Sequence, residues 1–390
     1  MSPPALPSRE RLLRALDRRP VDRVPCCFMS FTALRRRLGE DLFELAKAER
    51  RMGLDAMLFI PSAGRPLRPD HPDLRGLPVR FDPRVRTIER REGDVLYKTY
   101  ETPDGPLTTA VRLSEDWPHG DHIPFVDDFQ VPRMLKPLVT GPGDLPALRH
   151  LLAPPSPEDA ARFAEEARRA RAFAEEHDLL LAGGWGVGMD MAHWLCGMQD
   201  LMAHTMLRPD FAEELLETIH AWNLRRMEVV LSAPVDLYIR RSWYEGCDFV
   251  TPRFYRRAVL PRLKAEADLA HRHGARLGIL CTSGLNPMLD LFLEAGIDAL
   301  IGIDPVQGTH TDMALIRRKL GGRVCLWGGV SGAVTVELGT EEEIRAAVRR
   351  AIDTLGPDGF ILSPVDNITV DAPRTWRNLE TFIRAWRNGS

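Results

Sequence analysis

The chain has 390 residues, of which 44% are hydrophobic and 27% are charged, and its formal net charge is −3 at pH 7. These values are ordinary for a soluble globular protein, and a near-neutral charge favours neither a nucleic acid nor an anionic membrane surface as partner. No apolar run reaches the roughly 20 residues that a membrane span needs. The six cysteines show neither C-x-x-C pairing nor zinc-finger spacing, and no secretory segment is evident, so we expect free thiols in a cytoplasmic protein.

Eight short apolar runs, most of them followed by a helical pattern, predict the strands of the fold. These runs are residues 24–29, 56–62, 179–186, 236–243, 276–284, 299–306, 324–332 and 359–366. They are nearly continuous in apolar residues, as in parallel strands covered on both faces. Helices are expected at residues 157–177, 208–231, 251–274, 284–296 and 339–356, the last with Thr340 as N-cap and Gly356 as its closing residue.

This alternation predicts an α/β fold, a (β/α)8 TIM barrel formed by residues 1–390 as a single domain. The alternative is an open doubly wound sheet, but the Gly-x-Gly-x-x-Gly loop that would favour it is missing after the first strand. Residues 64–150 differ from the rest of the chain. They contain "RTIERREGDVLYKTYETPDGPLTTAVRL", which alternates apolar and polar residues around two turn sequences, and therefore predict a β-hairpin insertion between strands 2 and 3 that forms a lid.

Candidate functional residues follow the predicted strands, because the active sites of such barrels lie at the carboxyl ends of the strands. The substrate-binding candidates are Trp185, Asp190, His193, Arg240, Trp243, Tyr244, Ser283, Trp327 and Asn367, and the catalytic candidates are Glu245, Asp366 and Cys281. Simpler roles stay open for several of them: Ser283 and Asp366 could be helix caps, and Cys281 could be a small buried apolar residue. Aromatic rings beside a few carboxylates and hydroxyls indicate a pocket for an organic substrate with polar groups.

Several segments in a fixed order resemble the uroporphyrinogen decarboxylase superfamily, which includes corrinoid- and thiol-linked methyltransferases. They include "RERLLRALDRRPVDRVP", "YETPDGPLTT", "VPRMLKPLVTGPGDLPALRHLL", "VCLWGGVSG" and "GFILSPVDNI". The resemblance covers most of the chain and implies a (β/α)8 barrel. True decarboxylases of the family carry an arginine-rich "RQAGR"-type segment after the first strand. Here the corresponding segment reads "FMSFTALRRRLG", and its arginines fall in the following helix, which favours the methyltransferase branch.

The zinc-dependent methyltransferases of that family carry His-x-Cys-Gly after the fifth strand and a further cysteine after the eighth. The corresponding positions here are Cys281, Ser283 and Asp366. Serine is a poor zinc ligand, so the resemblance implies a zinc site that is incomplete or rebuilt. Cys281 and Asp366 are the metal candidates, and Glu245 and His310 are potential substitutes.

The resemblance implies an enzyme that removes or transfers a methyl group of a small substrate, with Glu245 or Asp366 as acid or base. A corrinoid would be carried by a separate partner protein, since no Asp-x-His-x-x-Gly run occurs here, and exposed barrel helices leave a homodimer open. One alternative is a decarboxylase or lyase that holds a carboxylate with Arg65, Arg240 or Arg241. The other is a non-catalytic barrel that binds a small molecule or a tetrapyrrole.

Overall fold

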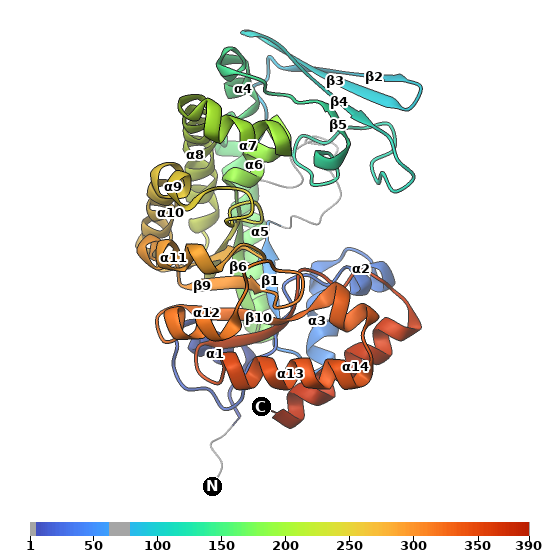
Figure 1. The fold of residues 1–390 in the computed structure, drawn as a ribbon, viewed down its shortest axis with the longest axis vertical. Helices are drawn as coiled ribbons and strands as arrows, with labels where there is room; N and C mark the ends of the chain where they lie inside the picture. Colours follow the sequence, from blue (N-terminus) through green and yellow to red (C-terminus); the bar gives the residue numbers. More distant parts are fainter. Residues whose placement is uncertain (1–4, 62–78, 390) are drawn as a thin grey trace.

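A curled parallel sheet of seven strands forms the centre of the fold (Figure 1). A computed structural model describes residues 5–61 and 79–389 of the chain. The strands are β1 (Met57–Ile60), β6 (Leu180–Gly186), β7 (Leu237–Arg241), β8 (Arg276–Leu280), β9 (Ala299–Ile303), β10 (Cys325–Ser331) and β11 (Phe360–Val365). They pair in that order, all parallel. This is an α/β fold of the TIM-barrel-like kind.

The first predicted strand, residues 24–29, is reduced to a single bridge between Cys26 and Leu362. The Cys27 N–H donates to the Leu362 carbonyl, and the Asp55 N–H, two residues before β1, donates to the Cys26 carbonyl. The segment therefore links β11 with the start of β1. Pro25 has no N–H to donate, which limits how far a regular ladder can run through this segment.

Alternation along the strands divides the apolar core into an inner and an outer layer, because neighbouring residues of a strand point to opposite faces. The inner layer lies within the curled sheet, and α1 (Ser8–Leu16) covers it at the amino ends of the strands. It consists of Leu12, Ala15, Leu16, Cys27, Leu180, Ala182, Leu237, Ile239, Leu280, Ala299, Ile301, Cys325, Trp327 and Ile361. The outer layer packs the other face of the strands against the helices.

The helices that follow the strands surround the sheet. Helices of the described residues are α1, α2 (Thr32–Leu38), α3 (Leu42–Arg51), α4 (Leu145–Leu151), α5 (Pro157–Glu176), α6 (Met189–Cys196), α7 (Met198–Leu207), α8 (Pro209–Leu231), α9 (Pro252–Phe254), α10 (Leu260–Arg272), α11 (Leu289–Ala295), α12 (Met313–Leu320), α13 (Glu341–Leu355) and α14 (Pro373–Gly389). Within residues 5–61 and 79–389, none is both long and apolar enough to cross a bilayer.

Two of the predicted helices differ from expectation in detail. The helix expected at 251–274 contains a π-helical segment, Tyr255–Val259, immediately before Leu260 and Pro261. Pro261 cannot donate to the carbonyl one turn earlier, and a wider turn accommodates this. Thr340 caps α13 as predicted and accepts the Glu343 N–H, but Gly356 ends the helix with φ −86° and ψ −168°. Pro357 follows, and the residue before a proline favours an extended conformation over the left-handed one.

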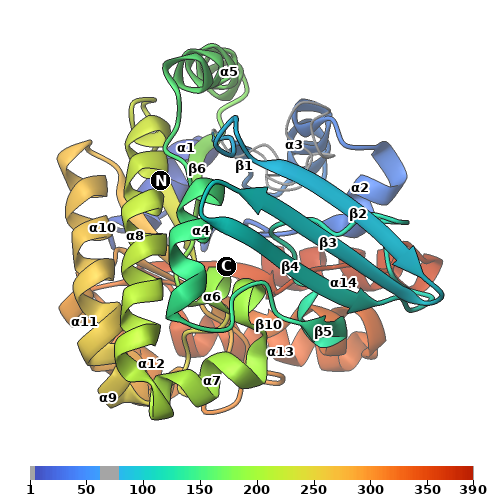
Figure 2. The same cartoon turned by 90° about the horizontal axis from the view of Figure 1, so that it is seen from above.

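A second sheet lies between β1 and β6 in the chain (Figure 2). Its strands β2 (Arg86–Glu92), β3 (Val95–Thr102), β4 (Gly105–Arg112) and β5 (Met134–Lys136) are antiparallel and pair in chain order. The two turns predicted in "REGD" and "TPDG" join β2 to β3 and β3 to β4. Residues 126–129, between β4 and β5, reach the carboxyl ends of β6 and β7 and contact Arg241 there.

Candidate functional site

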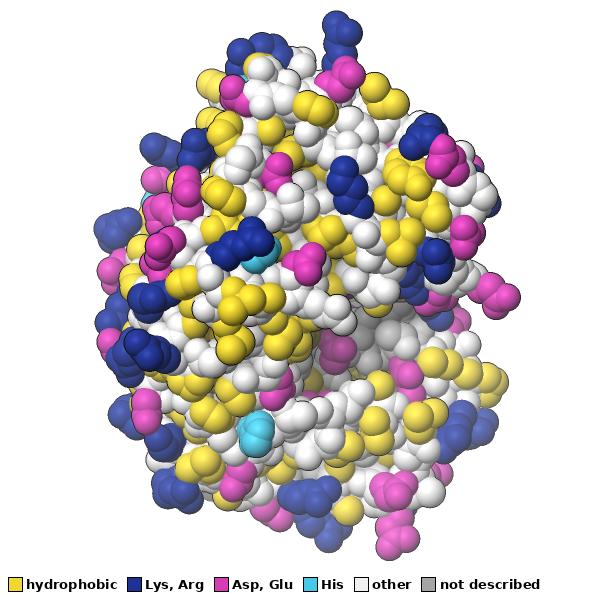
Figure 3. Space-filling view, turned by 45° about the horizontal axis from the view of Figure 1, so that its top comes forward, with side chains coloured by type: hydrophobic (Ala, Val, Ile, Leu, Met, Phe, Trp, Pro, Cys, Tyr) yellow, Lys and Arg dark blue, Asp and Glu magenta, His cyan; other side chains and the backbone are white. Residues whose placement is uncertain are grey.

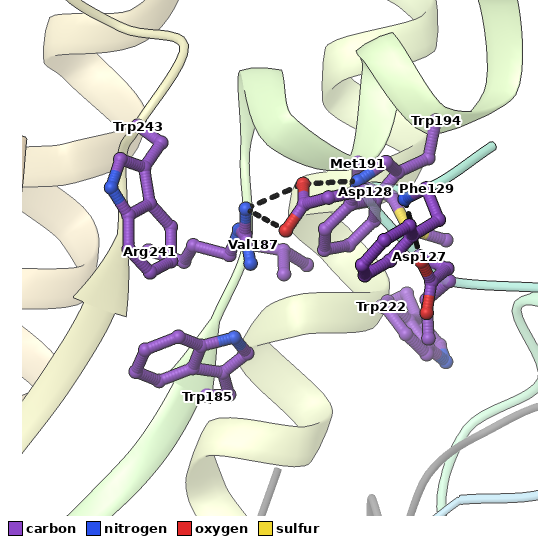
Figure 4. Close-up of a pocket in the computed structure, with 11 residues that line it drawn as sticks. Asp127, Asp128, Phe129, Trp185, Val187, Met191, Trp194, Trp222, Arg241 and Trp243 are labelled. Carbon is purple, nitrogen blue, oxygen red and sulfur yellow. Dashed lines mark hydrogen bonds and ion pairs between the residues drawn. The ribbon is translucent and has the colours of Figure 1, made fainter. Parts of the chain in front are cut away.

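A pocket opens at the carboxyl ends of β6 and β7 (Figure 4). In β7, Leu237 and Ile239 belong to the inner layer, so strand alternation directs Arg241 inward at the mouth of the barrel. The lining residues are Val126, Asp127, Asp128, Phe129, Trp185, Val187, Met191, Trp194, Trp222, Arg241 and Trp243, around a cavity of about 170 Å³. The surface drawn in Figure 3 is hollowed near its middle, with acidic side chains inside the hollow. The pocket is thus rich in indole rings and holds one arginine.

The Arg241 guanidinium is the charged centre of this pocket. Its Nη2 lies 2.7 Å from both carboxylate oxygens of Asp128, and its Nε donates to Asp190 at 2.5 Å. The same guanidinium lies over the rings of Trp243 and Trp194, at 4.1 and 4.8 Å from their centroids. Such stacking leaves the edge of a guanidinium free for planar ion pairs. Asp128 and Arg241 are joined by the dashed lines in Figure 4.

Asp190, at the start of α6, fixes the loop that follows β7. Its carboxylate accepts the backbone N–H groups of Tyr244 and Trp243 at 2.9 and 3.3 Å, besides the bond from Arg241. Burial, together with the charges of Glu245 and Asp128, raises the pKa of Asp190 to about 6, although Arg241 opposes this shift. Of the predicted residues, Trp185 and Trp243 line this pocket, whereas Asp190 and Tyr244 bond to its residues Arg241 and Asp128 without lining it.

Arg240 and Glu245 lie behind β7, in a separate buried cluster. Arg240 faces α10, where its Nε donates to Glu266 at 2.6 Å, and it also donates to Glu245. The other Glu245 oxygen accepts the Met189 N–H at 2.9 Å. Although burial opposes it, Arg240 and then His220 hold the pKa of Glu266 below its ordinary value. These buried charges satisfy one another, and the structure does not place Arg240 or Glu245 in the pocket.

Cys281 points away from the mouth. Leu280 belongs to the inner layer, so Cys281 falls on the outer face, where it is fully buried and its thiol contacts the Ser283 carbonyl at 3.6 Å. Burial raises the pKa of the Cys281 thiol far above its ordinary value, which disfavours the thiolate that a nucleophile or a metal ligand needs. Ser283 is half-buried beside it.

Asp366 follows β11 at the rim of the mouth and has an exposed side chain and a φ of +68°. Partial enclosure raises its pKa, with added repulsion from Asp128 and Asp304. Among the described residues, the one group of three metal-ligating side chains that converge includes neither Cys281 nor Asp366. The zinc site implied by the resemblance therefore does not fit this arrangement. The group that does converge is Cys247, Asp248 and His310, whose ligand atoms lie within 4.8 Å of one another.

The remaining predicted residues do not line the pocket, and their contacts are with other parts of the fold. Trp327 is fully buried inside the sheet, below the pocket, and its Nε1 donates to the Cys27 carbonyl at 2.9 Å. Asn367 bonds to the backbone and hydroxyl of Thr32 at 3.0 and 2.8 Å. His193 is buried beside the ring of Tyr244, and burial lowers its pKa to about 3, so its ring is neutral. Arg65 lies outside the described residues.

Several residues that line the pocket were not predicted from the sequence. Asp128 and Phe129 come from the segment after β4, Trp194 from α6 and Trp222 from α8. Trp194 could have been found, because it lies four residues after Asp190 and therefore on the same helix face. Asp128 and Phe129 carry only the weak signal of two acids flanked by apolar residues in "FVDDF".

Comparisons with known proteins agree with this architecture. The family model described as uroporphyrinogen decarboxylase matches residues 119–388, well over half of the chain. A curated uroporphyrinogen decarboxylase of Coxiella burnetii (strain Dugway 5J108-111) is 24% identical over 392 residues, covering 98% of this chain and 95% of its own. A solved structure of a methyltransferase from Methanosarcina mazei aligns with a TM-score of 0.61 and 17% identity, covering 98% of this chain and 99% of its own, which shows a shared fold. The chain belongs to the uroporphyrinogen decarboxylase family.

Proposed function

We propose that the pocket at the mouth binds a small methylated substrate and that the protein catalyses transfer of its methyl group. The observation that carries this proposal is the pocket itself, in which Trp185, Trp194 and Trp243 surround a cavity of about 170 Å³. A dry cavity of about 150 Å³ holds one benzene molecule. The enclosed space therefore suits a ligand of that size better than a tetrapyrrole.

The charges near the pocket argue against a polycarboxylate substrate. Asp127 and Asp128 line it with Arg241 as the one arginine, which already pairs with Asp128. The arginines of the segment after residue 30 lie on α2, where Arg35 and Arg37 pair with Glu40 and Asp371 on the surface. No cluster of unpaired guanidinium groups thus faces the mouth within the described part of the chain, which supports the methyltransferase branch.

The chemistry needs a proton donor for the leaving group. As the acceptor–carbon bond forms, the bond from the methyl carbon to its heteroatom breaks, and the heteroatom takes the electron pair and a proton. Asp366 is exposed at the mouth, and partial enclosure raises its pKa, which is the direction that a proton donor needs. Both Glu245 oxygens are already bonded, to Arg240 and to Met189 N–H, so Glu245 positions the loop and Asp366 is the acid.

The methyl acceptor would come from a partner. A reduced corrinoid on a separate protein supplies a strong nucleophile for such a carbon, and this chain has no cobalamin-binding run of its own. The mouth carries Asp366 on its rim, so a docked acceptor would meet the substrate beside the proposed acid.

The test is transfer of methyl from methoxyaromatics and methylamines to free reduced cobalamin by the intact protein. We expect turnover with one of these donor classes and a loss of about 100-fold in kcat for Asp366→Asn, the size typical of general acid catalysis. Glu342→Gln, on the exposed first turn of α13, is the matched control and should leave kcat unchanged. Absence of transfer with every donor, or an active Asp366→Asn protein, would contradict the proposal.

A second candidate function rests on Arg241. A substrate carboxylate could replace Asp128 against its guanidinium, as a decarboxylase or lyase on a small carboxylate would require. Arg240 is excluded from that role by its buried partners Glu245 and Glu266. Carbon dioxide release from small aromatic or branched acids, lost in Arg241→Met, would favour this function over methyl transfer.

A further inference from the structure

Three side chains from two loops that follow strands of the central sheet converge on one another. Cys247 and Asp248 follow β7, and His310 follows β9. Their ligand atoms lie within 4.8 Å of one another, with Cys247 and Asp248 half-buried and His310 exposed. We propose that these residues bind a divalent metal ion, with Zn²⁺ as the best match, and that a fourth position stays open to water or to a substrate. The proposal concerns metal binding and does not depend on methyl transfer.

The ligand types select the metal. A thiolate, an imidazole and a carboxylate together suit a borderline-soft ion such as Zn²⁺ and exclude Mg²⁺ or Ca²⁺, which prefer oxygen ligands alone. Zinc lies about 2.0–2.3 Å from such ligands, which places tetrahedral ligands roughly 3.3–3.8 Å apart. The ligand atoms lie within 4.8 Å of one another, so the cluster needs to contract by at most about 1.5 Å, which rotation of the exposed His310 side chain can supply.

The loops that carry the ligands are packed backbone against backbone. Cys247 N–H donates to the Gly284 carbonyl, and Gly284 N–H donates to the Thr309 carbonyl, at 3.0 and 2.9 Å. A β-carbon on Gly246 would lie 2.0 Å from the Ser283 carbonyl oxygen, and one on Gly284 would lie 2.5 Å from the Cys247 nitrogen. The glycines thus let the loop after β8 pack closely against the loop that carries Cys247 and Asp248, and Gly284 also bonds to the loop that carries His310, as a preorganised metal site requires.

One neighbouring hydroxyl orients the carboxylate. Thr309 Oγ1 donates to one oxygen of Asp248, which leaves the other oxygen for a metal. Partners of this kind fix the ligands of metal sites, and their loss typically costs about 10–100-fold in affinity. His310 itself has a φ of +46°, rare for a residue with a β-carbon, and its carbonyl accepts the Asn286 N–H at 2.9 Å.

This site differs from the one that the family resemblance implies. Cys281 and Asp366 lie at the ends of β8 and β11, whereas the proposed ligands follow β7 and β9. The two sites are nevertheless adjacent, because Gly284 bonds to both ligand loops. The metal would therefore lie in the same loop as Trp243, which lines the pocket.

The first experiment is a titration of the metal-free full chain with Zn²⁺ and with Co²⁺. Calorimetry measures the binding of both ions, and absorption spectroscopy detects a cobalt–thiolate bond. We expect one ion per chain, and an affinity loss of more than about 100-fold in each of Cys247→Ser, Asp248→Asn and His310→Gln. Thr309→Val should lose about 10-fold. Cys281→Ser is the matched control and should bind normally. No stoichiometric binding, or thiolate absorption that depends on Cys281 and not on Cys247, would overturn the proposal.

The second experiment needs no variant. Among the six cysteines, all within the described residues, Cys247 is the one that is not fully buried. A thiol-alkylating reagent should therefore modify Cys247 first in the folded protein, and Zn²⁺ should slow that reaction at least about tenfold, since the metal takes the reactive thiolate. Equal alkylation rates with and without Zn²⁺, measured by mass spectrometry of the peptides, would contradict coordination by Cys247.

Discussion

Arg240 and Arg241 are neighbours at the end of β7, yet they belong to two different regions of the molecule. Arg240 points outward to Glu266 and Glu245, and all three side chains are at most 2% exposed. Arg241 points inward to the mouth, where its partner Asp128 is 43% exposed. One strand therefore directs one guanidinium into the protein and the next toward a ligand, because successive side chains alternate.

The two ion clusters therefore have different roles. The charged groups behind β7 are paired with one another, and their hydrogen bonds connect β7 to α6 through Met189 and to α10 through Glu266. The charges at the mouth keep one side open to a cavity lined by indole rings. We therefore expect variants behind the strand to change stability and variants at the mouth to change activity.

The largest effect is expected for Arg240→Met. It leaves two carboxylates, Glu245 and Glu266, without their buried cation, and breaking such a pair costs about 3–5 kcal/mol of unfolding free energy. Urea denaturation measures this loss. Adding Glu245→Gln and Glu266→Gln removes the unpaired charges and should restore part of it. A loss below about 1 kcal/mol for Arg240→Met would show that water reaches the cluster, and it would contradict the distinction between a buried Arg240 and an accessible Arg241.

The second prediction concerns pH and Asp190. Its pKa rises from 3.8 to about 6 on folding, so the native state binds this proton more tightly than the unfolded state does. The stabilisation is complete below pH 3.8 and is lost as the pH rises through about 6. The shift corresponds to about 3 kcal/mol.

Comparing the wild-type protein with Asp190→Asn isolates that contribution. The difference in unfolding free energy, wild type minus variant, should fall by about 2 kcal/mol between about pH 4 and pH 7. Urea unfolding at intervals across this range measures it. A difference that stays flat with pH would mean that Arg241 keeps Asp190 ionised throughout.

The same two arginines show how far the sequence predicts this protein. The parallel strands after residue 56 were predicted to within one residue of their observed starts, because continuous apolar runs follow directly from burial on both faces, but the predicted strands 276–284 and 299–306 end four and three residues too late. The alternation in "LYIRRS" requires that Arg240 and Arg241 face opposite ways, but it does not say which one faces the mouth. That depends on the orientation of the whole strand within the sheet, which only the packing decides.

Only some of the residues that line the pocket could be predicted from the sequence, because the others reach it through long-range packing. Trp185 lies in β6, one residue before its end, and Trp243 lies two residues after β7, so the predicted strand ends located both. Asp128 comes from the segment after β4 and Trp222 from the middle of α8, and their approach to the mouth depends on long-range packing. Cys281 was misplaced because one step of alternation carries it to the outer layer.

The third prediction tests the mouth through Asp128→Asn. The pair with Arg241 is partly exposed, so the stability loss should stay below about 1 kcal/mol. The cavity, however, loses one negative charge beside Arg241, which keeps its bond to Asp190. The KM of a cationic methylated substrate should therefore rise about tenfold, equivalent to about 1.4 kcal/mol. Steady-state kinetics measures this, with Asp116→Asn, an exposed aspartate paired with Arg133, as control. Tighter binding of a small carboxylate instead would favour the lyase function.

The smallest effect is expected for Arg37→Ala, which tests whether the arginines of α2 contribute to substrate binding. Arg37 on α2 is about half exposed, pairs with Asp371 at 2.7 Å and stacks over Trp376. Exposed pairs and cation–π contacts each contribute about 1 kcal/mol or less. The free energy of unfolding should therefore change by about 1 kcal/mol, and kcat/KM should not change. A large loss of kcat/KM in a stable Arg37→Ala protein would mean that the α2 arginines reach the substrate, and a polycarboxylate would then become the better ligand for this mouth.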